Sequence, residues 1–490
     1  SGGYFHDAAA CLIKDGQLVF YIEEERLSGK RYALDQRPLL SILRCLEYAR
    51  IAAKDVDIVA LSWNPYFPKM ATSLEFNDPE ILGILPPSIF PDLRAKILII
   101  DHQVSHAAAA YRTSPFDDAL IFSLDGSGDG RSGVIFVAKS GKLHEIDSFD
   151  ITQSLGWFYQ RVTTYTGVGD WMHAGKTMAL ASFGQPIFNF PFLEVVQDGF
   201  KFHYSKDVPI PQTYVQSERT TFYAKQKQFF YEQFNKLCGH PNITLSRRDS
   251  LSNYRIYEEI PNVSKDLAAS AQAMLEKIIQ HLVLKYHMKY PLPICFSSGV
   301  AMNCKAMGTL VSEIKGLKGL YLSPVSGDMG GALGAAAEAL YQEMGVTKVP
   351  FVHAYWGCGY EDEVIDKFLK ELGIRNCYVD DPSEIAADMI SQGKIVGWFQ
   401  GRMEVGARAL GNRSILALPN NIKIKDKVNT SIKNREIWRS FSPSIIDDKT
   451  TRTIWKNLSF SSPFMAVALE AQEHLNDIVG VRHIDNTSRV

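Results

Sequence analysis

The chain is expected to fold around one stretch, His102-Gln103-Val104-Ser105-His106-Ala107-Ala108-Ala109-Ala110-Tyr111. Two histidines four residues apart lie on the same face of a helix, one turn from each other, so both imidazoles can reach one metal ion. The alanines that follow allow this helix to pack closely against a neighbour. The apolar run from Ile97 to Ile100 predicts a strand directly before it. The alternative is that both histidines are ordinary residues at the edge of a core.

Length and composition indicate a soluble globular protein. The 490 residues are 46% hydrophobic and 22% charged, and a chain of this length holds about two to four domains. The formal net charge of -2 argues against a nucleic-acid partner, and no apolar run is long enough to span a membrane. No signal peptide is visible, so a cytoplasmic location is expected. The seven cysteines form no CxxC pair and are expected to be free thiols.

Two segments about 120 residues apart have the same predicted pattern of strands. The first has strands at 8–14 and 17–22 around the turn Asp15-Gly16, and its opening strand is expected to be missing before Ser1. The second has strands at 119–124, 133–138 and 142–146, with a glycine-rich loop at 125–130. This repeat resembles the duplicated actin-like fold of acetate and sugar kinases and heat-shock ATPases, in which each half offers a loop to nucleotide phosphates.

The middle of the chain is predicted to contain an insertion and a long helix. Residues 185–262 are aromatic and polar, and we expect an irregular insertion that contacts the acceptor substrate. Ser264 is a plausible N-cap for a helix that keeps apolar spacing to about residue 288.

Two glycine-rich turns follow this helix. A strand at 292–296 runs into Ser297-Ser298-Gly299-Val300-Ala301-Met302-Asn303-Cys304, where glycine lets backbone N–H groups approach a nucleotide. Asp328 then opens a helix made largely of Gly and Ala, which requires close approach of a ligand or another helix. The alternative for both clusters is tight packing.

A second α/β domain is predicted after a linker at 346–360. Helix, strand, helix and strand are expected at 361–372, 377–379, 382–392 and 394–399. Residues 402–439 then hold nine Lys or Arg against three acidic residues, in a chain whose net charge is -2. Arginine binds phosphate bidentately and glycine frees backbone donors, so this basic segment suits phosphate groups. The alternative is a solvated basic face.

Nine motifs occur in an order that resembles one family. They are His6-Asp7, Glu24-Glu25-Arg26, HQVSHAAAAY, DGSGDG, the segment around Lys176, SSGVAMNC, GDMGGALGAA, GWFQGRMEVGARALGNRSIL and IKNREIWRSFSPSI. Together they closely resemble the carbamoyltransferases of the nodulation and antibiotic-tailoring family.

The resemblance implies an α/β fold with two domains. An actin-like (ASKHA) carbamoyl-transfer domain would span residues 1–350, with the insertion at about 185–262, and a YrdC-like domain would span 351–490, with its C-terminal end missing. The second domain would join carbamoyl phosphate and ATP into carbamoyl-adenylate. The first would transfer the carbamoyl group to a hydroxyl of a small-molecule, natural-product acceptor. Two alternatives are a tRNA threonylcarbamoyl-type transferase and a non-catalytic nucleotide- and metal-binding protein.

The resemblance also implies the site residues. His102, His106, Asp125 and Asp328 match ligands of Fe2+, or of another divalent metal such as Zn2+, and Mg2+ would accompany ATP. The implied catalytic residues are His6, Asp7 and Lys30. The implied nucleotide- and phosphate-binding residues are Asp129, Gly130, Lys176, Gly299, Asn303, Arg408, Lys433, Arg439 and Arg489. A homodimer is an open alternative to a monomer, and no nucleic-acid or membrane partner is expected.

Overall fold

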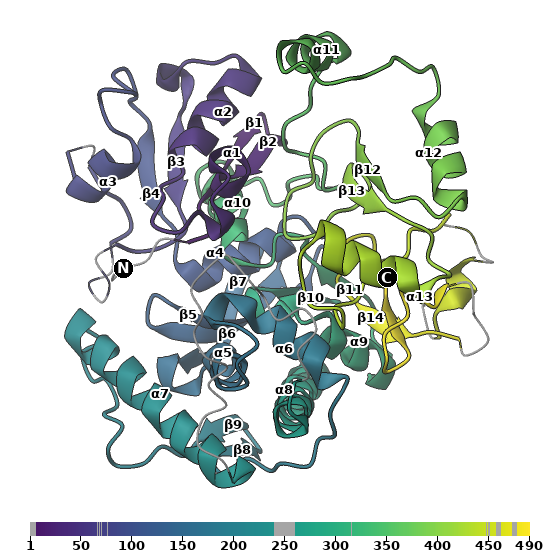
Figure 1. Cartoon of the computed structure of the whole chain (residues 1–490). Helices are drawn as coiled ribbons and strands as arrows, with labels where there is room; N and C mark the ends of the chain where they lie inside the picture. The colour runs from purple at the N-terminus through teal and green to yellow at the C-terminus, as the bar shows by residue number, and fades with distance from the viewer. Residues whose placement is uncertain are drawn as a thin grey trace.

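A five-stranded mixed sheet lies near the centre of the molecule (Figure 1). The strand order is β11–β10–β5–β6–β7, with β10 parallel to β5 and to β11, and β6 antiparallel to β5 and to β7. The strands are β5 (Ala119–Gly128), β6 (Arg131–Lys139), β7 (Lys142–Asp150), β10 (Ile294–Ser297) and β11 (Leu320–Leu322). β5 continues through Gly128, so most of the predicted glycine-rich loop at 125–130 is strand.

The computed structural model describes residues 6–490 apart from 66, 68, 70, 76, 240–259, 315, 447, 449–450, 457–461, 473–477 and the side chains of 451 and 452. Its fold is mixed α/β, and all seven cysteines are free, as predicted. No helix within the described ranges combines the length and apolar character needed to cross a membrane.

Both predicted strands of the first repeat are present and pair as a hairpin, but they do not join the two strands that follow them in one sheet. β1 (Ala9–Lys14) pairs antiparallel with β2 (Gln17–Glu23), and β3 (Ile58–Leu61) pairs parallel with β4 (Lys96–Ile99). Among the described residues, β1 and β3 each leave one edge unpaired. A cavity of about 1370 Å³, the first cavity, is lined by both strands and by helix α2 (Leu39–Ala49). Helices α1 (Glu24–Ser28) and α3 (Pro79–Ile84) complete this region.

Helix α4 (His102–Tyr111) packs closely against α10 (Gly331–Met344). A Cβ at Gly334 would lie 1.7 Å from the carbonyl oxygen of Ser105, so only glycine allows the two backbones to approach this closely. Beyond the end of α4, the fully buried Arg112 donates to Glu338 of α10 at 2.6 and 2.8 Å. The predicted close packing of the alanine-rich helix is therefore confirmed.

The segment predicted to be an irregular insertion is partly regular in its described residues. It contains β8 (Leu193–Val196), β9 (Gly199–Phe202) and α7 (Gln216–Cys238), while residues 240–259 lie outside the described part. Phenylalanines of these elements pack against α5 (Leu155–Tyr165) and α8 (Asn262–Lys289). Helix α8 begins before Ser264, which is therefore not its N-cap.

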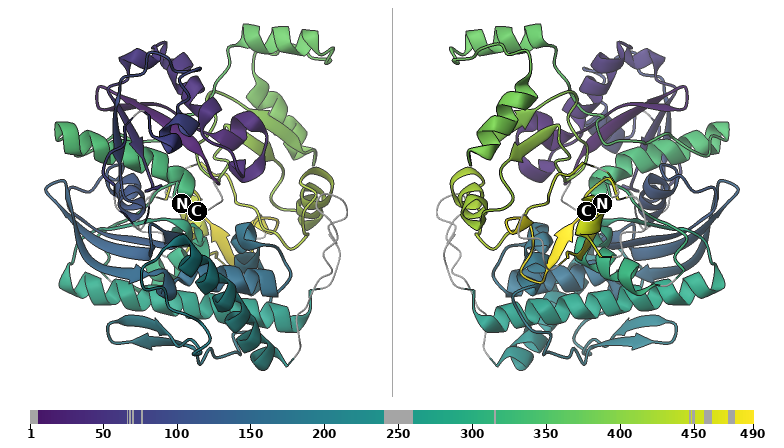
Figure 2. Two further views of the ribbon diagram at one scale, coloured as in Figure 1. Left: turned by 90° about the vertical axis from the view of Figure 1, so that its left-hand side faces the viewer. Right: turned by 90° about the vertical axis from the view of Figure 1, so that its right-hand side faces the viewer.

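The C-terminal part of the chain, from about residue 351 onward, lies beside the N-terminal part (Figure 2). Its elements are α11 (Asp362–Glu371), α12 (Pro382–Ser391), β12 (Val396–Phe399), β13 (Arg413–Leu416), α13 (Ile422–Lys427), β14 (Ala468–Glu470) and β15 (Thr487–Arg489). The predicted strand at 377–379 is absent, and these three residues have no regular secondary structure. β14 packs against α9 (Cys304–Glu313), which joins the C-terminal part to the central sheet.

Candidate active site

Three elements bring two histidines and two aspartates together. His102 and His106 lie one turn apart on α4, which Asp101 caps by accepting from the amide of Val104. Asp125 is part of β5, and Asp328 opens the short helical turn that precedes α10. The close contact between α4 and α10 therefore sets the separation between the imidazoles and Asp328.

The geometry of this cluster fits a metal ion. One ligand atom from each of the four residues lies within 4.8 Å of all the others. His102 Nε2 lies 3.1 Å from Asp125 Oδ2, and His106 Nε2 lies 3.5 Å from Asp328 Oδ1. A Cβ at residue 128 would lie 2.0 Å from Cδ2 of the His102 ring, so the ring needs the space that Gly128 leaves open. Two imidazoles and two carboxylates form a mixed nitrogen and oxygen donor set suited to divalent iron or zinc.

The electrostatics of the cluster also require positive charge. Burial opposes protonation of His102, but its hydrogen bond to Asp125 and the charge of Asp328 raise its pKa to about 10. Burial opposes ionisation of Asp125, yet the two histidines hold the pKa of Asp125 well below its usual range. The buried carboxylate of Asp125 and the half-buried carboxylate of Asp328 thus need either imidazolium protons or a bound cation.

His6 extends the cluster towards the adjoining cavities. Its Nδ1 lies 3.1 Å from Asp7 Oδ2, and its Nε2 lies 3.4 Å from Asp328 Oδ2. Burial opposes protonation of His6, but Asp328 and Asp7 outweigh it and raise the pKa of His6 to about 9. The carboxylate of Asp7 therefore orients the ring of His6 beside the cluster.

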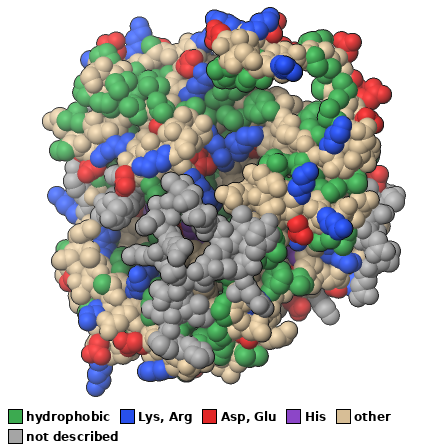
Figure 3. Space-filling model, in the orientation of Figure 1, with side chains coloured by type: hydrophobic (Ala, Val, Ile, Leu, Met, Phe, Trp, Pro, Cys, Tyr) green, Lys and Arg blue, Asp and Glu red, His purple; other side chains and the backbone are tan. Residues whose placement is uncertain are grey.

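The basic residues line a second cavity of about 1280 Å³ that also reaches the cluster. Arg408, Lys433, Arg435, Arg439 and Arg489 line it, together with His6, Asp125 and Asp328. Figure 3 shows Lys and Arg side chains bordering the hollow near the centre of one face. Five of the nine cations of the basic segment therefore line this cavity, so the segment is not simply a solvated face: they are Arg408, Lys425, Lys433, Arg435 and Arg439.

The mutual repulsion of these cations lowers their pKa values. Burial and the neighbouring Arg439 and Arg489 lower the pKa of Arg435 to about 9. Burial, together with Arg435 and Arg439, also lowers the pKa of Lys433. Crowded, partly desolvated cations of this kind are stabilised when an anion binds among them.

Three further predicted residues lie in the wall of the second cavity. Lys176, in α6 (Ala174–Ala181), forms a buried ion pair with Glu436 at 2.7 Å. Asn303 caps α9 and is hydrogen-bonded to Gln272, and the amide of Gly299 points to Asp125 Oδ1 at 3.3 Å. Gly299 and Asn303 therefore already have structural partners in this conformation.

Asp129 and Gly130 line the first cavity and not the second. The Asp129 carboxylate accepts from the backbone amides of His102 and Asn64 at 3.0 and 3.1 Å, so it anchors the start of α4. Gly130 has a φ of +80° and packs against Phe67. Lys30 is exposed and lines neither cavity, whereas its neighbour Arg31 lines the second.

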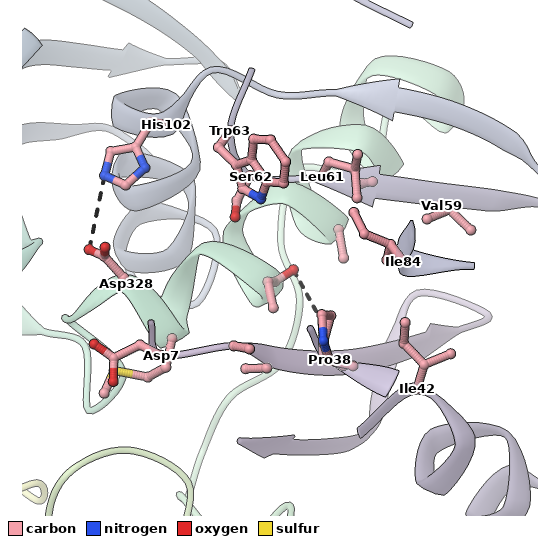
Figure 4. Close-up of a pocket in the computed structure, with 18 of the residues that line it drawn as sticks. Asp7, Pro38, Ile42, Val59, Leu61, Ser62, Trp63, Ile84, His102 and Asp328 are labelled. Atoms are coloured by element: carbon pink, nitrogen blue, oxygen red, sulfur yellow. Dashed lines mark hydrogen bonds and ion pairs between the residues drawn. The ribbon is translucent and has the colours of Figure 1, made fainter. Parts of the chain in front are cut away.

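The first cavity reaches the cluster from another direction. Figure 4 shows His102 and Asp328 at one end of it, with Val59 and Leu61 further along β3. Trp157, Gln160 and Tyr223 line the cavity close to the glycine-rich strand end. Sequence reasoning singled out neither these three residues nor Arg435 and Glu436 as site residues. Tyr223 lies in the aromatic segment 185–262, which was expected to contact the acceptor substrate, and Arg435 and Glu436 lie in the basic segment.

Fold and site together define an α/β enzyme with a cluster of metal-type ligands at the end of a basic cavity. Comparison with known sequences supplies the family. Residues 88–337 match the family model "Carbamoyltransferase N-terminus", and residues 387–490 match "Carbamoyltransferase C-terminus". The chain belongs to the carbamoyltransferase family and is an enzyme of that class.

Relatives cover almost all of the chain. Nodulation protein NolNO of Sinorhizobium fredii is 30% identical over 99% of this chain and 69% of its own length. An uncharacterized protein of Synechocystis is 28% identical over 99% and 85%, respectively. The 3'-hydroxymethylcephem-O-carbamoyltransferase of Amycolatopsis lactamdurans is 25% identical over 99% and 85%. Among solved structures, T. kodakarensis HypF aligns at 12% identity with a TM-score of 0.34, over 70% of this chain and 48% of that one, which is too low to indicate a shared fold.

Proposed function

We propose that the chain is an ATP-dependent carbamoyltransferase that forms carbamoyl-adenylate and transfers its carbamoyl group to a hydroxyl of a small molecule. One observation carries this proposal: the second cavity is continuous from the basic residues of the C-terminal part to the His/Asp cluster. An intermediate formed among the cations can reach the cluster without leaving the protein. The name of the Amycolatopsis relative, an O-carbamoyltransferase, supports a hydroxyl acceptor.

The first half-reaction takes place among the basic residues. Water displaces phosphate from carbamoyl phosphate and leaves carbamate. An oxygen of the carbamate then attacks the α-phosphorus of ATP, which would bind together with Mg2+. Pyrophosphate leaves and carbamoyl-adenylate remains. Arg408, Lys433, Arg439 and Arg489 bind the phosphate groups and stabilise the negative charge that shifts during this step. Lys176 is held against Glu436, which keeps its ammonium group in the wall of the same cavity.

The second half-reaction takes place beside the cluster. The acceptor oxygen attacks the carbamoyl carbon, AMP leaves, and the hydroxyl proton passes to His6 Nε2, with Asp7 orienting the ring. Neutral His6 is required for this role, whereas a pKa of about 9 keeps the imidazole protonated at neutral pH. A divalent iron or zinc ion held by His102, His106, Asp125 and Asp328 would supply Lewis acidity and offset the carboxylate charge that raises the pKa of His6.

We further propose that residues 1–350 are a duplicated actin-like domain and that 351–490 are YrdC-like. Each half of the first region contains an antiparallel pair and a parallel pair of strands, β1–β2 with β3–β4 and β5–β6 with β10–β11. This correspondence between the halves supports a duplication.

The test separates the two half-reactions. The chain is incubated with ATP and carbamoyl phosphate without acceptor, and pyrophosphate and carbamoyl-adenylate are followed by mass spectrometry. We expect wild type and His102→Ala to form the adenylate and Arg408→Ala to lose it. Arg375→Ala changes an exposed arginine of the same region and is the matched control.

Two results would contradict the proposal. If the wild-type chain releases no pyrophosphate that depends on carbamoyl phosphate, the adenylate route is wrong. If Arg408→Ala forms adenylate as fast as the Arg375→Ala control, the basic cavity is not where it forms.

A further inference from the structure

Arg408 belongs to a loop that is folded around one carboxylate. This loop, the arginine loop, is residues 400–412 and joins β12 to β13. Oε1 of the buried Glu404 accepts three hydrogen bonds of 2.7 to 3.0 Å from the backbone amides of Leu410, Asn412 and Arg413. The carboxylate therefore closes the turn that contains Arg408.

The arginine loop is attached to the N-terminal part of the chain at Gly406, two residues before Arg408. The amide of Gly406 donates to Oε1 of Glu23, and its carbonyl oxygen accepts from Nη2 of Arg26 at 3.1 Å. Gly406 has a φ of +87°, and a Cβ there would lie 2.2 Å from the carbonyl oxygen of Pro324, so the contact requires glycine. Side chains of the N-terminal part thus bind both polar groups of this residue.

Glu23 and Arg26 belong to a charged run that neither half-reaction uses. Glu23 is the last residue of β2 and Arg26 lies in α1. Glu23 is 3% exposed, and its Oε2 lies 3.7 Å from Nε of Arg26. Arg26 also forms an ion pair of 3.0 Å with Glu25. Hydrogen bonds between charged side chains and backbone groups are strong and directional, so this pair suits the fixing of a neighbouring loop.

We propose that Glu23 is a positioning residue for the first half-reaction. Together with Arg26 it fixes Gly406, and it thereby holds Arg408 in the wall of the second cavity, where Nη2 of Arg408 donates to the carbonyl oxygen of Met302 at 3.5 Å. A residue of the N-terminal part thus controls how the C-terminal part binds phosphate groups. This inference rests on the proposed function for the identity of the reaction, but its effect on anion binding is tested separately.

The binding test is a double-mutant cycle, with pyrophosphate as the probe and isothermal titration calorimetry as the readout. Arg408→Ala and Glu23→Ala should each weaken pyrophosphate binding about tenfold or more, because a displacement of about 1 Å removes much of what a positioned cation contributes. The double variant should bind no more weakly than Arg408→Ala, since Glu23 acts through Arg408. No binding by wild type, or losses that multiply in the double variant, would overturn the proposal.

Glu24→Ala is the matched control for Glu23→Ala. Glu24 is the next residue and is also 3% exposed, but its carboxylate accepts from Leu40 and Ser41 at the start of α2, and it lines neither cavity. It should leave pyrophosphate binding unchanged. Equal weakening in both variants would indicate a general loss of structure and would overturn the proposal.

Two further variants separate positioning from folding, which circular dichroism verifies. Glu23→Gln keeps an oxygen that can accept from the amide of Gly406, so it should restore most of the affinity that Glu23→Ala loses. An affinity as low as that of Glu23→Ala would contradict the role of this hydrogen bond. If Glu23→Ala fails to fold, Arg26→Met replaces it in the cycle, because it removes the other side-chain contact to Gly406. An unchanged affinity in Arg26→Met would then overturn the proposal.

Formation of carbamoyl-adenylate by the wild-type chain is measured in parallel. If no adenylate forms, the proposed function fails, and the pyrophosphate cycle still decides whether Glu23 positions Arg408. If adenylate forms, the KM for carbamoyl phosphate should rise about tenfold in Glu23→Ala and stay unchanged in Glu24→Ala. An unchanged KM in Glu23→Ala would contradict the positioning role.

Discussion

Gly128 illustrates how a single residue without a side chain can shape the cluster. The imidazole of His102 lies where a Cβ of residue 128 would be, and Asp125, three residues earlier on the same strand, holds the ring by a hydrogen bond. The end of β5 therefore provides both a ligand and the space for another ligand.

Gly128→Ala should displace the His102 ring and weaken metal binding by about tenfold or more, as changes next to a metal ligand commonly do. The measurement is metal content after incubation with Fe2+ or Zn2+, with circular dichroism to verify folding. Gly126→Ala is the control, because a Cβ there would meet only ordinary contacts at 3.7 and 3.9 Å. Equal metal retention by both variants would show that His102 can move aside at no cost.

The spacing of His102 and His106 could be predicted from the sequence because helical periodicity is local. Asp125 and Asp328 lie far away along the chain, and only the family resemblance linked them to the histidines. The grouping of Trp157, Gln160 and Tyr223 at the first cavity was not predicted, although Tyr223 lies in the segment expected to contact the acceptor, because it forms only when α7 packs on α5 and α5 packs on β5. Tertiary contacts of this kind leave no regular spacing in a sequence.

At the scale of elements, α4 and α10 set the geometry of the cluster. Their backbones approach through Gly334, and the buried pair of Arg112 and Glu338 fixes their relative position. Because α4 carries both histidines and Asp328 directly precedes α10, any separation of the helices separates the ligands.

Gly334→Ala should force these helices apart. A Cβ 1.7 Å from a backbone carbonyl cannot be accommodated by a side-chain rotation, and overpacking of this kind costs about 1–3 kcal/mol or more. We expect a lower urea midpoint of unfolding together with weaker metal binding. Gly175→Ala, in α6, has no neighbour within 4 Å of the new Cβ and should leave the midpoint unchanged or raise it. A Gly334→Ala variant as stable as this control would contradict the close approach.

Element prediction failed where apolar residues were few or dispersed. Helix α7 buries Phe222, Phe229, Phe230 and Phe234 on an otherwise polar surface, and so narrow an apolar stripe does not predict a helix over this segment. The short run at 377–379 has β-type residues, but no neighbouring strand pairs with it in the described structure. Strands need partners that a local pattern does not reveal.

At the scale of the whole molecule, ion pairs join the C-terminal part of the chain to the N-terminal part. Asp485 accepts from Lys305 at 2.6 Å and from Ser182 at 2.7 Å. Burial opposes its ionisation, but Lys305 and these hydrogen bonds hold the pKa of Asp485 well below its usual range. The contact therefore stabilises the folded protein only when Asp485 is ionised.

This contact predicts a dependence of stability on pH. The pKa of Asp485 is lower in the folded state than its unfolded value of about 3.9, so its contribution is complete above that pH and is lost as the pH falls further. Asp485→Asn should lower the free energy of unfolding at pH 7 by about 1–3 kcal/mol, and the difference from wild type should shrink below about pH 4. Urea unfolding between pH 3 and 7 measures it, with the exposed Asp380→Asn as control. A difference that does not change with pH would contradict the assignment.

The open edges of β1 and β3 bear on the handling of the protein in solution. Each edge carries backbone groups without a ladder partner in the described structure, and such edges attract extended segments of other chains. Concentrated samples should therefore form oligomers through these two strand edges. A charged substitution at the Lys14 end of β1, the end of the strand away from His6 and Asp7, can therefore improve sample behaviour without changing the chemistry.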